Sequence, residues 1–288
     1  MERLVLKRFM SDKEGEALSG KFLDESHFDT LITEDTDGYS VDGEMLFRFR
    51  KGQIPLHLAK AGYESFKGSI SWTEGRGLAS GGSFKRIRKD GTVGNTTVGF
   101  KVQSGAVGFM DENAMIRYCR KTAFTNKFFE TFKKGIPFIE KVDELYRELC
   151  PEHWKRQKAI ADGTNKNYRI ADTSFTTVTV NRNFQTAVHK DAGDFPKGFG
   201  NLAVYREGHY EGSYFVLPEF RVAVDMQNTD ILFVDVHRWH GNTAFKNMSE
   251  DYLRIAFVMY YREYMINCKT PSEELKRVKN DRGGFLKL

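Results

Sequence analysis

Two short segments of the sequence carry residues that could bind a metal ion. The first is His189-Lys190-Asp191, which follows the β-prone residues 186–188. Side chains two positions apart on a strand lie on the same face, so the His189 imidazole and the Asp191 carboxylate could bind one ion. With 7 histidines and 39 acidic residues in the chain, such a pair also arises by chance. A surface His–Asp pair without a metal is therefore an equal alternative.

The second segment, residues 230–242, contains His237 and His240 just before Gly241. The two histidines are separated by an odd number of positions, so they lie on opposite faces of an unbroken strand. We expect His240, which shares its face with the apolar residues at 232, 234 and 236, to complete the site. A β-bulge near Arg238 would exchange the faces and favour His237 instead.

Two imidazoles and one carboxylate on one side of an ion form the facial triad of non-haem Fe(II) oxygenases. The other side of the ion then stays open for a bidentate co-substrate and for O2. Zinc is bound by the same types of ligand, so the triad alone does not distinguish the two metals. Cys119, Cys150 and Cys268 form no CxxC pair, and we expect free thiols in a reducing compartment. Any metal must therefore be bound by histidine and carboxylate.

Arg254 stands near the start of the apolar segment 253–261, which is typical of a buried strand. A buried guanidinium needs a partner, because an unpaired buried charge is costly. Its fork of N–H donors fits a carboxylate in bidentate fashion. We therefore expect Arg254 to bind the distal carboxylate of 2-oxoglutarate. A structural Asp or Glu is the alternative partner.

The elements that must position these residues are mostly short strands. Turn residues separate them at intervals that are typical of an antiparallel sandwich or barrel rather than of βαβ units. The predicted strands are Thr173–Val180, Gln185–His189, Asn201–Arg206, Ser213–Leu217, Arg221–Asp225, Asp230–His240 and Leu253–Tyr261.

Helices are predicted before this region. Apolar residues recur at helical spacing over 138–149, between Pro137 and Pro151, and further helices are expected over 125–134 and 151–161. The first 120 residues combine short strands, such as 45–49, with a Gly-rich segment and a hairpin turn at Asp90-Gly91. We therefore predict a mainly β protein with packing helices (α+β). Its parts are a β- and loop-rich N-terminal region packed on the core (1–120), supporting helices (121–167), the β core (168–268) and a C-terminal tail (269–288).

The composition limits the class of protein. The 288 residues are 40% hydrophobic and 14% aromatic, which excludes a disordered chain. No apolar run approaches the roughly 18 residues that cross a bilayer, and no secretory signal is evident. We expect a cytoplasmic or nucleoid-associated protein that is not secreted and has no membrane partner. The formal net charge of +5 permits a polyanionic partner without requiring one.

Residues 168–268 resemble the catalytic core of Fe(II)/2-oxoglutarate dioxygenases, and most closely the TET/JBP group, especially its phage-type members. The segments that carry the resemblance are 175–184, 186–194, 235–242 and 254–262. Phe124-Thr125-Asn126 and Arg76-Gly77 are similar to the upstream region of the family with less specificity. The resemblance implies a double-stranded β-helix (jelly roll) core.

The resemblance also implies site residues. His189, Asp191 and His240 would bind Fe(II), and Arg254 would bind 2-oxoglutarate. Many relatives have Ser two positions after this arginine, whereas this chain has Ala256. One hydrogen bond to the co-substrate is then either missing or supplied elsewhere.

Four further residues are assigned to the substrate: Asp194, Arg262, Asn181 and Arg76. Asp194 and Arg262 stand where TET-type enzymes have an Asn and a His that touch the target base. A carboxylate and a guanidinium fit 5-methylcytosine and thymine alike, because each base offers one donor beside one acceptor. A pairing of Asp194 with Arg262 is the alternative.

The implied activity is hydroxylation of the 5-methyl group of 5-methylcytosine or thymine in DNA, with Fe(II), 2-oxoglutarate and O2. It proceeds by decarboxylation of 2-oxoglutarate, hydrogen abstraction and hydroxyl rebound, on a flipped or single-stranded pyrimidine. Aromatic residues could stack on that base, although each is more often a core residue: Phe184, Tyr210, Tyr214 and Phe215. The basic cluster 85–89 could contact phosphates. The rival functions are a 2-oxoglutarate hydroxylase of a protein or small molecule and a non-catalytic cupin-like metal-binding module; no obligate protein partner is inferred.

Overall fold

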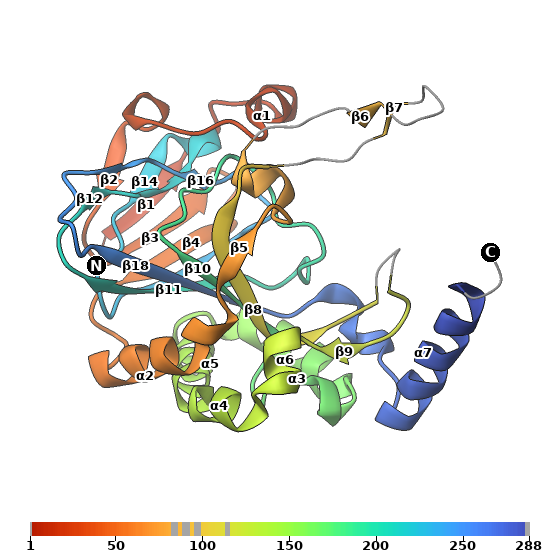
Figure 1. Cartoon of the computed structure of the whole chain (residues 1–288). Helices are drawn as coiled ribbons and strands as arrows, with labels where there is room; N and C mark the ends of the chain where they lie inside the picture. Colours follow the sequence, from red (N-terminus) through yellow and green to blue (C-terminus); the bar gives the residue numbers. More distant parts are fainter. Residues whose placement is uncertain (1, 82–85, 88–92, 95–98, 113–115, 286–288) are drawn as a thin grey trace.

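Two packed β-sheets and a layer of helices make up the computed structural model, which describes residues 2–81, 86–87, 93–94, 99–112 and 116–285 (Figure 1). The strands of the main sheet are ordered β1 (Glu2–Leu6), β3 (Thr36–Ser40), β4 (Met45–Arg50), β15 (Ile231–Val234), β11 (Gly200–Glu207), β18 (Leu253–Tyr260), β10 (Thr177–Arg182), β8 (Val102–Met110) and β5 (Ser71–Thr73). The smaller sheet has the order β16 (Gly241–Asn242), β13 (Phe215–Leu217), β14 (Val222–Val224) and β2 (Thr30–Ile32).

Short strand pairs lie outside these two sheets. They are β12 (Glu211–Gly212) with β17 (Phe245–Lys246), and β6 (Arg86–Ile87) with β7 (Val93–Gly94). The tenth strand of the main sheet, β9 (Arg120–Lys121), branches from the order given above and pairs with β8. The α-helices are α1 (Asp12–Leu18), α2 (Leu56–Phe66), α3 (Ala123–Lys127), α4 (Phe129–Lys134), α5 (Ile136–Leu149), α6 (Pro151–Gly163) and α7 (Pro271–Phe285).

The alternation of side chains along the main strands divides the core in two. Leu232 and Val234 of β15 pack against the small sheet, whereas Ile231 and Phe233 face the helices. The helix side is closed by the apolar stripe of α5, which includes Val142, and Figure 1 shows α2, α4, α5 and α6 together on that side of the main sheet. The predicted fold class, mainly β with packing helices around a jelly-roll core, is confirmed.

Several predicted elements differ from the structure. The strand expected over Gln185–His189 is wrong: this segment is a loop, joined to residue 240 by an isolated bridge. The strand expected over Asp230–His240 ends at Val234. The helix expected over 125–134 is divided at Phe128 into α3 and α4. The helices expected over 138–149 and from Pro151 are confirmed as α5 and α6.

Strands from the first 110 residues continue both sheets. β4 pairs with β15 at one side of the β11–β18–β10 group, and β8 pairs with β10 at the other. β2 adds a parallel strand to the small sheet. The segment expected to be a C-terminal tail contains α7. The Asp90-Gly91 turn lies outside the described residues, as do residues 85, 88 and 89 of the basic cluster.

The prediction of three free thiols is wrong for two of them. Cys119 and Cys268 form a disulfide across 149 positions of sequence, with their Cα atoms 5.6 Å apart. Their separation in the chain gave no sign of this, because the fold alone brings the two segments together. Cys150 remains free and buried. Among the described helices, none combines the length and the apolar character needed to cross a membrane.

Candidate metal centre and active-site cavity

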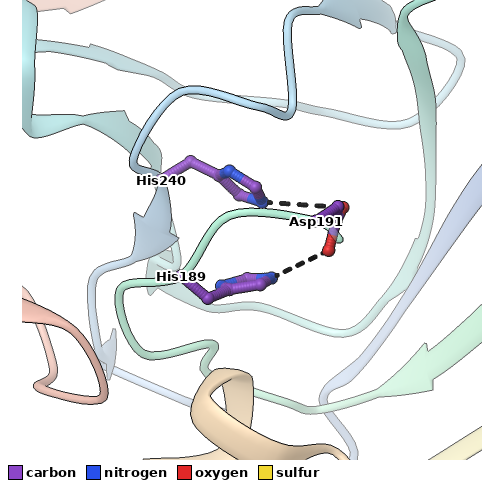
Figure 2. Close-up of side chains that lie close together, drawn as sticks. All are labelled: His189, Asp191 and His240. Atoms are coloured by element: carbon purple, nitrogen blue, oxygen red, sulfur yellow. Dashed lines mark ion pairs between the residues drawn. The ribbon is translucent and has the colours of Figure 1, made fainter. Parts of the chain in front are cut away.

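His189, Asp191 and His240 converge on one point, although no strand presents them as the sequence predicted (Figure 2). His189 and Asp191 lie on the loop after β10, and His240 lies just before β16. One ligand atom from each lies within 4.8 Å of the others. The Asp191 carboxylate is 3.4 Å from Nε2 of His189 and 3.8 Å from Nε2 of His240.

Backbone hydrogen bonds hold the two imidazoles in this orientation. Nδ1 of His189 lies 2.8 Å from the carbonyl oxygen of Ala187, and Nδ1 of His240 lies 2.9 Å from that of Arg238. If each Nδ1 carries the proton and donates it there, both Nε2 lone pairs point toward the carboxylate. The donor set is then two neutral imidazoles and one carboxylate on one side of a shared point, which fits Fe(II).

The two loops that carry the ligands are joined directly. The backbone N–H of His189 donates to the carbonyl of His240 at 2.9 Å, and the reverse bond is 3.0 Å long. Gly241 permits this approach, because a Cβ there would lie 3.1 Å from the carbonyl oxygen of Thr186. The loops thus take the place of the two strands that the sequence predicts over 185–189 and 230–240.

Burial and mutual charge set the protonation of the three ligands. Burial alone would lower the pKa of His189, but the hydrogen bond and charge of Asp191 outweigh it and raise that pKa. Burial opposes ionisation of Asp191, yet His189 lowers its pKa to about 2. Burial and the charge of His189 lower the pKa of His240 to about 4. Proton competition with a metal ion therefore falls mainly on His189.

We expect divalent-ion binding to weaken as the pH falls through the raised pKa of His189. A protonated imidazole has no lone pair for the ion, so binding must release one proton below that pKa and none above it. The apparent affinity then falls about tenfold for each pH unit below it. Titration with Co(II) followed by absorption between pH 5 and 8 measures this slope. An affinity independent of pH over that range would contradict the assignment.

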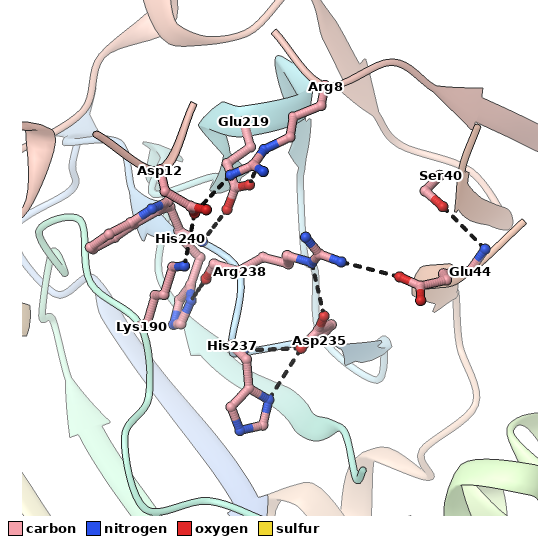
Figure 3. A network of polar contacts seen from close by, with 11 residues as sticks. Arg8, Asp12, Ser40, Glu44, Lys190, Glu219, Asp235, His237, Arg238 and His240 are labelled. Atoms are coloured by element: carbon pink, nitrogen blue, oxygen red, sulfur yellow. Dashed lines mark hydrogen bonds and ion pairs between the residues drawn. The ribbon is translucent and has the colours of Figure 1, made fainter. Parts of the chain in front are cut away.

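A network of polar groups, some buried and some exposed, supports the His240 loop (Figure 3). The fully buried Glu219 carboxylate accepts a hydrogen bond of 2.7 Å from the backbone N–H of Trp239 and forms an ion pair of 2.9 Å with Arg8. At the start of the same loop, Asp235 accepts from the backbone N–H of His237 at 3.1 Å. His237 therefore faces Asp235 rather than the metal point, which leaves the β-bulge alternative without support.

The metal point opens into a cavity of about 340 Å³. Along β18 every second residue lines it, from Arg254 through Ala256, Val258 and Tyr260 to Arg262. The Arg254 residue is only 6% exposed, and within the described part of the chain its guanidinium forms no ion pair with a carboxylate. Burial lowers its pKa, and nearby Tyr210 offsets this in part. A buried cation facing a cavity in this way fits an anionic ligand.

Asn181 and Arg76 also line the cavity, on the side of β10 and β8. The Nε of Arg76 donates to the hydroxyl of Ser104 at 2.7 Å, and its Nη2 donates to the carbonyl of Gly105 at 2.9 Å. The Ser104 hydroxyl in turn donates to Oδ1 of Asn181 at 2.5 Å. Both predicted residues are therefore held in place by hydrogen bonds that leave further N–H donors for a ligand.

Asp194 and Arg262 meet at the same end of the cavity, but not as an ion pair. Their backbones form an isolated bridge, whereas Nε of Arg262 lies 2.6 Å from Oδ1 of Asp111. Burial raises the pKa of Asp194 well above its usual range, and the charge of Asp191 adds to this. Burial thus favours the protonated form of the Asp194 carboxyl group, which lies beside an oriented guanidinium.

The four predicted stacking residues fall into two pairs. Phe184 and Phe215 line the cavity, and Phe215 stacks on His240 with ring centroids 5.4 Å apart. Tyr210 is buried against Phe245 and lies near Arg254, and the half-buried Tyr214 packs edge-on against Phe28. Neither residue of the second pair is among those that line the cavity.

A family model for the oxygenase domain of the 2OGFeDO superfamily, named Tet_JBP, matches residues 108–263, which include every predicted metal ligand and Arg254. The chain belongs to the Tet/JBP family. Its members are Fe(II)- and 2-oxoglutarate-dependent dioxygenases, so the predicted family and enzyme class are confirmed.

Individual relatives extend this finding. Thymine dioxygenase JBP1 from Trypanosoma brucei brucei is 35% identical over 185 residues, which are 63% of this chain and 22% of JBP1. The bifunctional helicase and thymine dioxygenase JBP2 from Trypanosoma cruzi (strain CL Brener) is 31% identical over 251 residues, 86% of this chain and 21% of JBP2. The chain thus spans about a fifth of the length of these relatives.

Among solved structures, NgTET1 in complex with 5mC DNA is similar to this chain with a TM-score of 0.58 and 15% identity. The likeness covers 87% of this chain and 86% of the NgTET1 chain. At this identity the comparison shows a shared fold.

Sequence reasoning missed three residues that support the site. Tyr260 could have been predicted, because it lies an even number of positions after Arg254 on the same strand and therefore on the same face. Asp111 lies at the end of β8, and Glu219 lies between β13 and β14. No local pattern marks these two acids, because each contacts its partner only across the folded chain.

Removal of the Glu219 side chain is expected to weaken metal binding by about tenfold, as outer contacts of metal ligands typically do. Glu219→Ala leaves the Trp239 N–H without its acceptor and frees the backbone beside His240. Calorimetric titration with Mn(II) gives the affinity. Glu44→Ala is the matched control, because Glu44 is an exposed partner of Arg238 in the same network. Equal affinities in both variants would show that Glu219 does not position the ligand.

Proposed function

We propose that this Tet/JBP domain hydroxylates the 5-methyl group of thymine in DNA. The observation that carries the proposal is the joint placement of the His189–Asp191–His240 cluster and the buried Arg254 in one cavity. Thymine is favoured over 5-methylcytosine because similar relatives, such as JBP1 at 35% identity, are thymine dioxygenases.

Fe(II), when bound with 2-oxoglutarate and O2, supplies the oxidation that converts a methyl C–H bond to C–OH while 2-oxoglutarate becomes succinate and CO2. The chain's own residues bind and orient the reactants. His189, Asp191 and His240 hold the ion, and Arg254 grips the distal carboxylate of the co-substrate.

Asn181 supplies the hydrogen bond that Ala256 lacks. The two residues are opposite one another in the β10–β18 pair, so their side chains lie on the same face. Because Oδ1 of Asn181 accepts from Ser104, its NH2 group remains available to a ligand in the cavity. Arg76, which is held by Ser104 as well, turns its remaining donors toward the substrate.

The target base must leave the helix to reach this cavity, at a cost of a few kcal/mol in a duplex. Asp194 and Arg262 then read its polar edge. A neutral Asp194 carboxyl donates its O–H to O4 of thymine and accepts from N3–H, while Arg262 donates to a remaining acceptor. Phe184 and Phe215 offer apolar walls for the ring.

Loss of the Asp111 carboxylate is expected to impair base recognition without affecting the co-substrate. Asp111→Asn keeps the size of this side chain, which is 1% exposed, but removes the charge that orients Arg262. We expect the KM for DNA to rise about tenfold, the usual worth of a charge-assisted hydrogen bond, with the KM for 2-oxoglutarate unchanged. Steady-state assays measure both constants. Glu112→Gln, at the next position in the chain, should leave both unchanged.

The proposal is tested by incubating the protein with Fe(II), 2-oxoglutarate and O2 on oligonucleotides that contain thymine alone or thymine and 5-methylcytosine. Nucleoside mass spectrometry is expected to detect thymine with one added oxygen, in step with succinate formation. If only 5-methylcytosine were oxidised, the target base would be 5-methylcytosine and not thymine. Succinate formation that DNA never stimulates would favour a hydroxylase of a protein or small molecule, and no turnover at all would favour a binding module.

A further inference from the structure

A second hollow of about 280 Å³ lies beside the active-site cavity, at the outer end of the main sheet. We call it the β5 groove. Its walls combine aromatic, cationic and amide side chains, and the described residues that line it include no acid. Those that matter here are Phe22, Trp72, Lys101, Gln103, Arg182 and Phe184. Its lining includes Trp72 of β5 and Gln103 of β8, two antiparallel strands that Figure 1 shows side by side.

The pairing of three strands places a tryptophan, an amide and an arginine in one row. Trp72 of β5 is opposite Gln103 of β8, and Gln103 is opposite Arg182 of β10. Residues opposed in antiparallel strands have side chains on the same face, about 5 Å apart at Cβ. Trp72 is 61% exposed, so this large ring is held on a sheet without a core to cover it.

The charges of the groove have one sign. Lys101 and Arg182 are both exposed, and neither forms a salt bridge with another described residue. Phe22, which is 41% exposed, stacks on Phe100 with ring centroids 6.0 Å apart. Exposed aromatic rings beside unneutralised cations are the composition of surfaces that bind single-stranded nucleic acid, where bases stack and phosphates pair with cations.

The groove adjoins the catalytic cavity. Phe184 lines both hollows, and it lies on the loop that carries His189. The neighbouring Asn183 accepts a hydrogen bond of 2.7 Å from the backbone N–H of Arg254, which fixes this shared wall to the cavity floor. A chain whose base enters the cavity past Phe184 therefore has its adjacent nucleotides at the groove.

We propose that the β5 groove binds the DNA strand next to the extruded thymine, with a base stacked on Trp72 and phosphates at Lys101 and Arg182. The inference rests on the proposed function for the identity of the target base. The binding itself is separate from turnover. Gln103, between the ring and the guanidinium, adds a hydrogen bond to base or sugar without selecting a sequence.

The experiment titrates the metal-free protein with a single-stranded 12-nucleotide oligomer and follows tryptophan fluorescence. Trp72 is the exposed member of three tryptophans, so stacking should quench its emission. Trp72→Phe should bind with nearly unchanged affinity but lose the quenching, and anisotropy of a labelled oligomer reports its affinity. Trp72→Ala should bind about ten- to a hundredfold more weakly. Arg182→Gln and Lys101→Gln should each reduce the slope of log affinity against log salt by about 0.7.

Lys134→Gln is the matched control, because Lys134 is exposed on α4, outside the groove, and loses the same charge. Affinities of Trp72→Ala and Arg182→Gln equal to that of the unchanged protein, or an equal loss in Lys134→Gln, would overturn the proposal. In turnover assays the groove variants should raise the KM for the oligomer while the KM for 2-oxoglutarate stays the same. If no thymine is oxidised but Trp72-dependent binding persists, the groove assignment stands and the proposed function fails.

Discussion

Replacement of His240 by glutamine is expected to abolish succinate formation and thymine hydroxylation, with a loss on the order of a thousandfold or more. His240 supplies one of two imidazoles at the metal point, and its Nε2 lies 3.8 Å from Asp191. Two remaining ligands cannot hold the ion firmly, so the metal content after gel filtration should fall together with activity. Metal analysis and the nucleoside assay on the same preparations test both statements.

His237→Gln provides the matched control for this result. His237 lies three positions earlier on the same loop and is half-buried, but its ring contacts Asp235 at 3.2 Å. The variant should keep its metal and most of its activity. If His237→Gln lost the ion while His240→Gln retained it, His237 rather than His240 would be the metal ligand, which contradicts the geometry of the loop.

Arg254→Ala is expected to raise the KM for 2-oxoglutarate by about 10- to 150-fold, the equivalent of about 1.5–3 kcal/mol for hydrogen bonds to a charged group. The guanidinium is buried in the cavity without an ion pair to a described carboxylate, so the co-substrate is the partner that we assign to it. Metal content should not change. Assays of succinate formation at varied 2-oxoglutarate give the constant, with DNA held at saturation.

Arg262→Ala separates this effect from a general loss of positive charge in the cavity. Both arginines line the same space on β18 or directly after it, but Arg262 is paired with Asp111 at the end that we assign to the base. We expect that variant to raise the KM for DNA alone. Equal responses of the two variants to 2-oxoglutarate would remove the special role of Arg254.

The fold and the metal cluster could be predicted from local patterns, though not always for the right reason. The spacing of His189 and Asp191 was interpreted as two positions on a strand, whereas the structure presents both on a loop. The same three ligands were nevertheless assigned, because the resemblance rests on the order of residue types and not on strand geometry. Arg254 and its cavity-facing neighbours follow from true strand alternation along β18.

The parts that sequence could not predict depend on contacts across the folded chain. Asp111 and Arg262 are 151 positions apart, and Cys119 and Cys268 are 149 apart. Neither pair has a neighbouring pattern that distinguishes it from an unpaired acid or a free thiol. The hydrogen bond from the backbone N–H of Trp239 to Glu219, which supports the His240 loop, also depends on a contact across the folded chain.

The flanking strands have a practical consequence for expression of shorter pieces. A fragment that began at residue 108, where the family match begins, would lack β4 and most of β8, leaving the backbone of β15 and β10 unpaired at two open edges. Exposed strand edges of this kind recruit other chains and promote aggregation. The smallest autonomous catalytic piece therefore extends well beyond the segment that carries the chemistry, toward the amino terminus.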